Sequence, residues 1–169
     1  LLPTLLAHLL DTRVLDHEAI WLKPMKFQLS MAIHGGTVAL AVLLLPASAR
    51  ASAWVRWPVW ALVVTMAYEL IFLSLQAARG VRSHFNDANP FDAIGGQIMA
   101  MGAGVLVTAP MVIAAYILLQ AIRRRMLSPL LLATVAGLLA GNVLAAYAGS
   151  SLGMNGGPFV GTFDPADPT

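Results

Sequence analysis

The chain has 169 residues, of which 59% are hydrophobic and only 11% are charged. A typical soluble domain is about half apolar and a quarter charged, so most of this apolar surface is expected to face lipid. The formal net charge is +2, and no basic tract interleaved with aromatic residues points to nucleic acid. The sequence contains no cysteine, which excludes disulfides, iron–sulfur clusters and thiolate zinc sites in this chain.

Four apolar runs reach the length of about 20 residues that a helix needs to cross a bilayer. They lie at about 26–45, 57–78, 91–120 and 127–147. Residues 1–10 read as the end of a truncated first span, segment 11–25 as a polar connection and 148–169 as a soluble Gly/Pro-rich tail. Only helices and closed barrels satisfy their backbone groups in lipid, and these runs are rich in Ala, Leu and Met. We therefore expect an all-α transmembrane bundle, one domain over 1–169, of four full spans plus a truncated first span, from a longer protein.

The orientation rests on the positive-inside rule. Successive spans alternate sides, and each side then carries five Lys or Arg residues. The cluster "RRR" at 123–125 lies in a very short loop and favours the cytoplasm. We therefore expect loops 46–56 and 121–126 to be cytoplasmic in a bacterial inner membrane. Loop 79–90 and the tail 148–169 would then be extracytoplasmic.

Polar residues within the spans gather in the half that faces loop 79–90. Glu69 falls on one face of its span with Gln76 and Arg79, and Lys26, Ser30 and His34 share a face of another. A carboxylate costs at least about 2.5–3.5 kcal/mol in lipid, so Glu69 should face inward, protonated or paired with a basic side chain. We expect Glu69 to converge with the basic groups of this half. The candidate ligand-binding residues are Lys23, Lys26, Ser30, His34, Glu69, Gln76, Arg79, Arg82, His84 and Asn86.

The stretch "QAARGVRSHFNDANPFD" (76–92) lies between two of the expected spans. Gly80 suits the residue after a helix C-terminus, and Asn89 suits an N-cap that precedes Pro90 and Asp92. These end signals leave "RSHFN" (82–86) without a structural role. The repeated glycines, including the Gly137/Gly141 pair, are expected to permit close helix packing.

Two motifs carry a resemblance to a known group. "KPMKF" (23–27) and "QAARGVRSHFN" (76–86) resemble recurring motifs of a family of uncharacterised bacterial multi-spanning membrane proteins. A loop similar to "GGP" (156–158) recurs there, and members continue into further helices beyond it. The resemblance implies truncation at both ends and joins the two motifs into one signature. It implies no activity and no catalytic residue.

These features favour an integral membrane protein with a polar pocket that binds a small ligand or ion, as in a transporter or sensor. One alternative is an intramembrane zinc-dependent hydrolase, because Ser30 and His34 form an SxxxH pattern like that of progestin/adipoQ receptors and alkaline ceramidases. A second is a haem site that uses His8 and His34. A third is a structural subunit of a membrane complex or homo-oligomer. The sequence leaves enzymatic activity and the identity of any cofactor open, and it assigns no residue to a metal.

Overall fold

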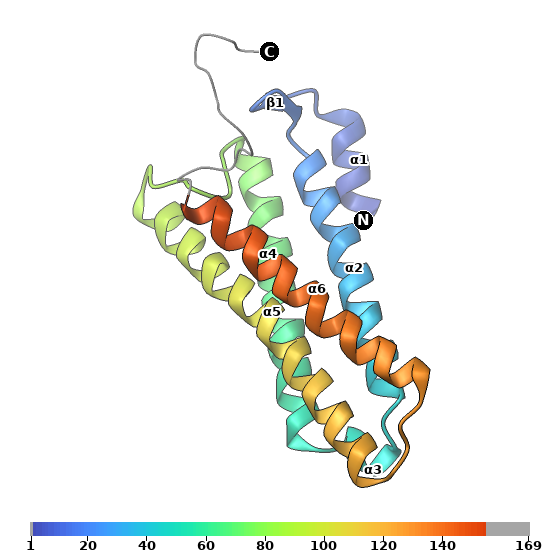
Figure 1. Ribbon diagram of the computed structural model, residues 1–169. Coiled ribbons are helices and arrows are strands. Elements are labelled where there is room, and N and C mark those ends of the chain that lie inside the picture. The colour runs from blue at the N-terminus through green and yellow to red at the C-terminus, as the bar shows by residue number, and fades with distance from the viewer. Residues whose placement is uncertain (1, 155–169) are drawn as a thin grey trace.

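The computed structural model describes residues 2–154 and is a bundle of helices with one short hairpin (Figure 1). In chain order the elements are α1 (Leu2–Leu10), β1 (Val14–Leu15), β2 (Glu18–Ala19), α2 (Leu22–Leu43), α3 (Ala47–Arg50), α4 (Ala53–Arg79), α5 (Pro90–Arg123) and α6 (Pro129–Met154). The expected all-α bundle is therefore confirmed at the level of fold class.

Within residues 2–154, three helices are long and apolar enough to cross a membrane: α4, α5 and residues Pro129–Ser151 of α6. They support a multi-pass membrane protein. Helix α2 is not among them, although it has 22 residues, because its first half carries Lys23, Lys26, Gln28 and other polar side chains. The fourth full span, expected at 26–45, stays a prediction.

Segment 11–25 differs from the expected plain connection. Val14 and Leu15 pair antiparallel with Ala19 and Glu18 to form a hairpin. The two residues between the strands, Asp16 and His17, have φ of 53° and 64°. Positive φ at both central residues matches the type I′ turn that suits the twist of a two-residue hairpin, and it is a conformation that Asp tolerates better than most residues.

The C-terminal end also differs from the expectation. Helix α6 continues to Met154, so residues 148–154 belong to it and not to a soluble tail. The remaining tail, which includes "GGP" at 156–158, lies outside the described residues.

The predicted ends of α4 and α5 are confirmed. Gly80 follows Arg79 with φ 76°, a left-handed conformation that glycine adopts without steric cost. The Asn89 side chain accepts a hydrogen bond of 3.0 Å from the backbone N–H of Asp92, and Pro90 begins the helix. These two signals place the 80–89 connection between α4 and α5.

The two ends of the bundle are built differently. We call the end with the hairpin and the 80–89 connection the hairpin end, and the opposite end the α3 end (Figure 1). One large apolar core joins α2 to α6 from the middle of the bundle to the α3 end. Its buried members are Val38, Ala41, Leu45, Ala49, Val55, Leu62, Ala109, Ile113, Ala114, Ile117, Ala121, Leu131, Val135 and Leu138.

Buried polar side chains lie elsewhere. Those described are Thr4, Glu69, Gln76, Ser83, Asp92 and Asn142. All belong to the half of the bundle near the hairpin end, where the apolar cluster is smaller and consists of Phe72, Leu73 and Met99. The bundle thus has an apolar half and a polar half, as the distribution of polar residues along the spans predicts.

Candidate functional site

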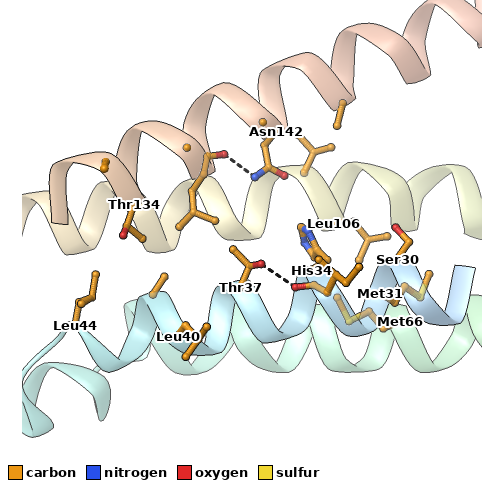
Figure 2. Close-up of a pocket in the computed structure, with 18 of the residues that line it drawn as sticks. Ser30, Met31, His34, Thr37, Leu40, Leu44, Met66, Leu106, Thr134 and Asn142 are labelled. Carbon is orange, nitrogen blue, oxygen red and sulfur yellow. Dashed lines mark hydrogen bonds between the residues drawn. The ribbon is translucent and has the colours of Figure 1, made fainter. Parts of the chain in front are cut away.

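A cavity of about 920 Å³ lies among α2, α4, α5 and α6. Figure 2 shows Ser30, His34 and Thr37 of α2 facing Thr134 and Asn142 of α6 across it. Apart from a few polar groups the lining is aliphatic, with one aromatic ring, Phe27. A mainly apolar cavity of this size with a few convergent polar groups is typical of a small-molecule site.

Glu69 of α4 is the acidic residue of the cavity lining. Its side chain is 3% exposed, and its Oε1 atom makes no hydrogen bond within the described part of the chain. Nε2 of His34 is also buried without a hydrogen-bond partner among residues 2–154. Buried polar atoms are nearly always hydrogen-bonded, so these two positions call for an explanation outside ordinary packing.

Glycine on α5 makes room for the Glu69 carboxyl group. A Cβ atom at Gly102 would lie 2.9 Å from Glu69 Oε1 and 2.9 Å from Thr65 Cγ2. Gly95, which lies nearer the hairpin end of α5, makes room for the Phe72 ring in the same way. A Cβ atom there would lie 2.2 Å from that ring. The expected close packing of glycines is therefore present at these two positions of α5.

The packing interpretation is wrong for the GxxxG pair of α6. A Cβ atom at Gly137 or Gly141 would meet no atom within 4 Å, and both residues line the cavity. Their missing side chains leave open volume beside Asn142 instead of admitting a neighbouring helix. Asn142 itself donates a hydrogen bond of 2.7 Å to the carbonyl of Leu138 and is 7% exposed.

A second group of candidates surrounds Asp92 at the start of α5. The Arg79 guanidinium forms an ion pair with the Asp92 carboxylate, with one N–H donating to Oδ2 at 3.3 Å. The Gln76 amide donates to Asp92 Oδ1 at 2.8 Å, and the Asn89 amide donates to Oδ2 at 2.7 Å. Arg79 also lies 5.1 Å above the Phe91 ring, a cation–π contact. This network holds the ends of α4 and α5 together.

The hairpin makes the next ion pairs. Arg82 Nε donates to Asp16 at 2.9 Å, which ties the hairpin to the 80–89 connection. The Lys26 ammonium binds Glu18 at 2.9 Å, and both side chains are more than half exposed. Lys23 lines a smaller cavity of about 360 Å³ with Asp16, Glu18 and other residues of this end.

The "RSHFN" stretch forms a compact turn against α2. The Ser83 hydroxyl lies 3.0 Å from His84 Nδ1, and the His84 ring lies 6.0 Å from the ring of Phe27. The Asn86 amide donates to the Arg82 carbonyl at 3.0 Å. Burial, and then the nearby positive charge of Lys23, lower the pKa of His84 to about 4.

The expected convergence of Glu69 with Arg79, Arg82 and Lys26 is wrong, whereas His34 lines the same cavity as Glu69. Arg79 lies ten residues further along α4, about 15 Å at 1.5 Å per residue, and its charge is directed to Asp92. The other basic side chains find carboxylates outside the spans, Arg82 at Asp16 and Lys26 at Glu18. The ten candidates therefore separate into two sets. Ser30, His34 and Glu69 line the cavity, whereas Lys23, Lys26, Gln76, Arg79, Arg82, His84 and Asn86 lie at the hairpin end.

Several partners of the basic side chains were not among the predicted site residues. Asp16 and Glu18 look like ordinary loop acids, and Asp92 looks only like a helix-start residue. A search for acids that flank the polar stretch could have found Asp92, which lies 13 residues after Arg79. No local sequence signal indicates that Asp16 reaches Arg82, because their contact depends on the hairpin fold.

The alternatives that need a metal or haem gain no support from the arrangement. Among residues 2–154, no group of three His, Cys, Asp or Glu side chains is placed to hold one metal ion. His8 belongs to α1 and is not part of the cavity lining, so it does not share the cavity with His34. Ser30 and His34 do share it, one helical turn apart.

Comparisons of the chain with protein-family models, with curated proteins and with solved structures find no match.

Proposed function

We propose that this chain is the ligand-binding part of a multi-pass protein of the bacterial inner membrane, of transporter or sensor type. The bound species is a small molecule or ion held in the cavity among α2, α4, α5 and α6. The observation that carries this proposal is the Glu69 carboxyl group, buried beside a cavity of about 920 Å³ with an oxygen that has no partner among the described residues. A purely structural bundle would gain nothing from such a group.

The resemblance of "KPMKF" and "QAARGVRSHFN" to motifs of uncharacterised bacterial membrane proteins supports the same setting. In this proposal the ion-paired residues of these motifs at the hairpin end fix that end of the bundle and do not line the cavity. Asp92 and Asp16 neutralise Arg79 and Arg82 there, so the basic groups act on structure more than on the ligand.

Exposed tryptophans support a membrane–water interface near the α3 end, and the arginines of this end, with the cluster at 123–125, support its cytoplasmic side. Trp54, Trp57 and Trp60 of α4 are 65%, 72% and 60% exposed and lie near the α3 end. Tryptophan is enriched where a membrane meets water, and Arg50 and Arg56 lie at the same level of the chain. We propose that the α3 end lies at the cytoplasmic surface and the hairpin end at the extracytoplasmic surface.

Cysteine labelling tests whether the cavity is open. The chain has no cysteine, so Ser30→Cys and Thr134→Cys place single thiols in its lining. In the full-length protein in nanodiscs, N-ethylmaleimide, which is small and uncharged, should modify both. Val135→Cys, whose side chain is buried in the apolar core, is the matched control and should react far more slowly.

Failure of both cavity positions to react would mean that protein fills the space. That result would overturn the ligand-binding proposal and favour the structural subunit, whose polar faces meet another chain.

A further inference from the structure

We propose that the ligand of this cavity is a hydrophobic organic cation, a molecule that joins an ammonium-like charge to an apolar body. This inference rests on the proposed ligand-binding function and adds the chemical class of the ligand. The charges of the lining, its oxygen atoms and the position of its opening all favour such a ligand.

The charges of the lining select a cation. Of its residues, Glu69 is the acid and His34 is the other titratable group, and no Lys or Arg belongs to the lining. At the hairpin end Arg79, Arg82 and Lys26 are paired with Asp92, Asp16 and Glu18, and Lys23 lines the separate smaller cavity. An ionised Glu69 in this apolar setting therefore attracts positive charge strongly, and no Lys or Arg of residues 2–154 forms an ion pair with it.

The oxygen atoms of the lining argue against a metal cation. Calcium takes six to eight oxygen ligands, and magnesium needs near-octahedral coordination. Beside Glu69 the lining side chains with oxygen are Ser30, Thr37, Thr134 and Asn142. All four are neutral, so Glu69 offers the one carboxylate of the lining to a metal ion. An organic cation needs one counter-charge and a large apolar contact, and this lining offers both.

The opening of the cavity faces the bilayer. Helices α4 and α5 pack along each other, as do α5 and α6, whereas α2 and α6 make few contacts. The cavity lies in the gap between α2 and α6 (Figure 2). Leu40 of α2 and Leu130 of α6 belong to its lining and are 69% and 68% exposed. A ligand with an apolar body, already dissolved in lipid, can enter there with its charge directed to Glu69.

The test uses tetraphenylphosphonium as the probe and full-length protein in nanodiscs. Tetraphenylborate has the same shape and the opposite charge, so it separates charge recognition from simple partition into an apolar groove. Equilibrium dialysis should show saturable binding of the cation. For the borate it should show no saturable binding, only partition into the lipid. Glu69→Gln should weaken binding of the cation by about tenfold or more, because it removes the counter-charge in a low-dielectric site. Glu18→Gln, at an exposed acid outside the cavity, is the matched control and should leave binding unchanged.

A second variant fills the space without changing the charge. Gly137→Leu places a side chain into open volume on the cavity wall, so the fold should tolerate it while binding is lost. Gly36→Leu, also at an open position but not in the lining, should bind normally.

Three results would overturn the inference: no saturable binding of tetraphenylphosphonium, equal binding of tetraphenylborate, or binding that survives both Glu69→Gln and Gly137→Leu. If Ser30→Cys and Thr134→Cys still react with N-ethylmaleimide in that case, the cavity binds another class of ligand and only this inference fails.

Discussion

Arg79 and Asp92 form an ion pair that joins the last turn of α4 to the first turn of α5. The Asp92 side chain is 1% exposed and also accepts hydrogen bonds from Gln76 and Asn89, whereas the Arg79 side chain is 35% exposed. This carboxylate is the centre on which three other polar side chains converge. Its removal takes away the charged acceptor that these three side chains share.

Asp92→Asn should therefore lower the free energy of unfolding by about 3 kcal/mol, the low end of the range for breaking a buried charge pair, because the Arg79 side chain is partly exposed. Asp16→Asn, which breaks the more exposed pair with Arg82, should cost about 1 kcal/mol or less. Unfolding of the full-length protein in mixed SDS micelles measures both. An equal loss of unfolding free energy in the two variants would contradict the larger contribution that we assign to Asp92.

Gly95→Ala should destabilise the bundle by about 1–3 kcal/mol, because the new Cβ would overlap the Phe72 ring. Gly96→Ala, one residue later, meets nothing within 4 Å and should be neutral or slightly stabilising. The same unfolding measurement compares them. Adding Phe72→Leu to Gly95→Ala should restore part of the loss; a double variant less stable than both singles combined would argue against this contact.

His84 predicts a dependence of stability on pH. Its pKa is about 4 in the folded protein against a usual value of 6.5, so the unfolded chain binds a proton more readily. Stability should be insensitive to this group above pH 6.5 and should fall as pH decreases from 6.5 toward 4, by about 3 kcal/mol at most. Melting temperatures between pH 8 and pH 4 should show a shallower decline in His84→Gln.

The control for His84 is His17→Gln, because His17 is exposed in the hairpin turn. It should keep the pH profile of the unchanged protein. A profile that is identical in His84→Gln and in the unchanged protein would show that this imidazole does not contribute.

The orientation is tested with single cysteines at exposed positions on the two ends. Ala88→Cys lies in the 80–89 connection, and Ala51→Cys lies beside α3. A membrane-impermeant maleimide applied to intact spheroplasts should modify Ala88→Cys and spare Ala51→Cys until the membrane is permeabilised. The reverse pattern would place the hairpin end in the cytoplasm.

Much of the fold could be predicted from local sequence signals. The apolar runs mark α4, α5 and α6, and the caps at Gly80 and Asn89 fix the boundaries of the 80–89 connection, because each signal acts within a few residues. The hairpin at 14–19 escaped prediction since its strands have only two residues each, too short for an alternating pattern. The type I′ turn at Asp16 and His17 also lacks the Asn-Gly or Asp-Gly pair that would announce it.

The candidate site could be predicted only in part. Depth along the spans placed Ser30, His34 and Glu69 in one half of the bundle, and all three line the cavity. The partner of each charge could not be predicted. Which carboxylate pairs with Arg79 or Arg82 depends on how the helices are rotated and on the path of the hairpin. The open positions at Gly137 and Gly141 were missed for a related reason. A GxxxG pattern indicates where another helix can approach the backbone closely. It does not indicate whether a helix is packed there.

The unequal ends of the bundle have a consequence for the movement of α2. At the α3 end, moving α2 away from its neighbours loses the van der Waals packing of the aliphatic core, at a cost that added salt does not reduce. At the hairpin end, the segment that leads into α2 is tied to the 80–89 connection by the exposed Arg82–Asp16 pair, and to the last turn of α4 by a hydrogen bond that Arg13 donates to the Ala78 carbonyl. Exposed ion pairs weaken as ionic strength rises. The freedom of α2 at the hairpin end should therefore respond to the salt concentration of the compartment that this end faces.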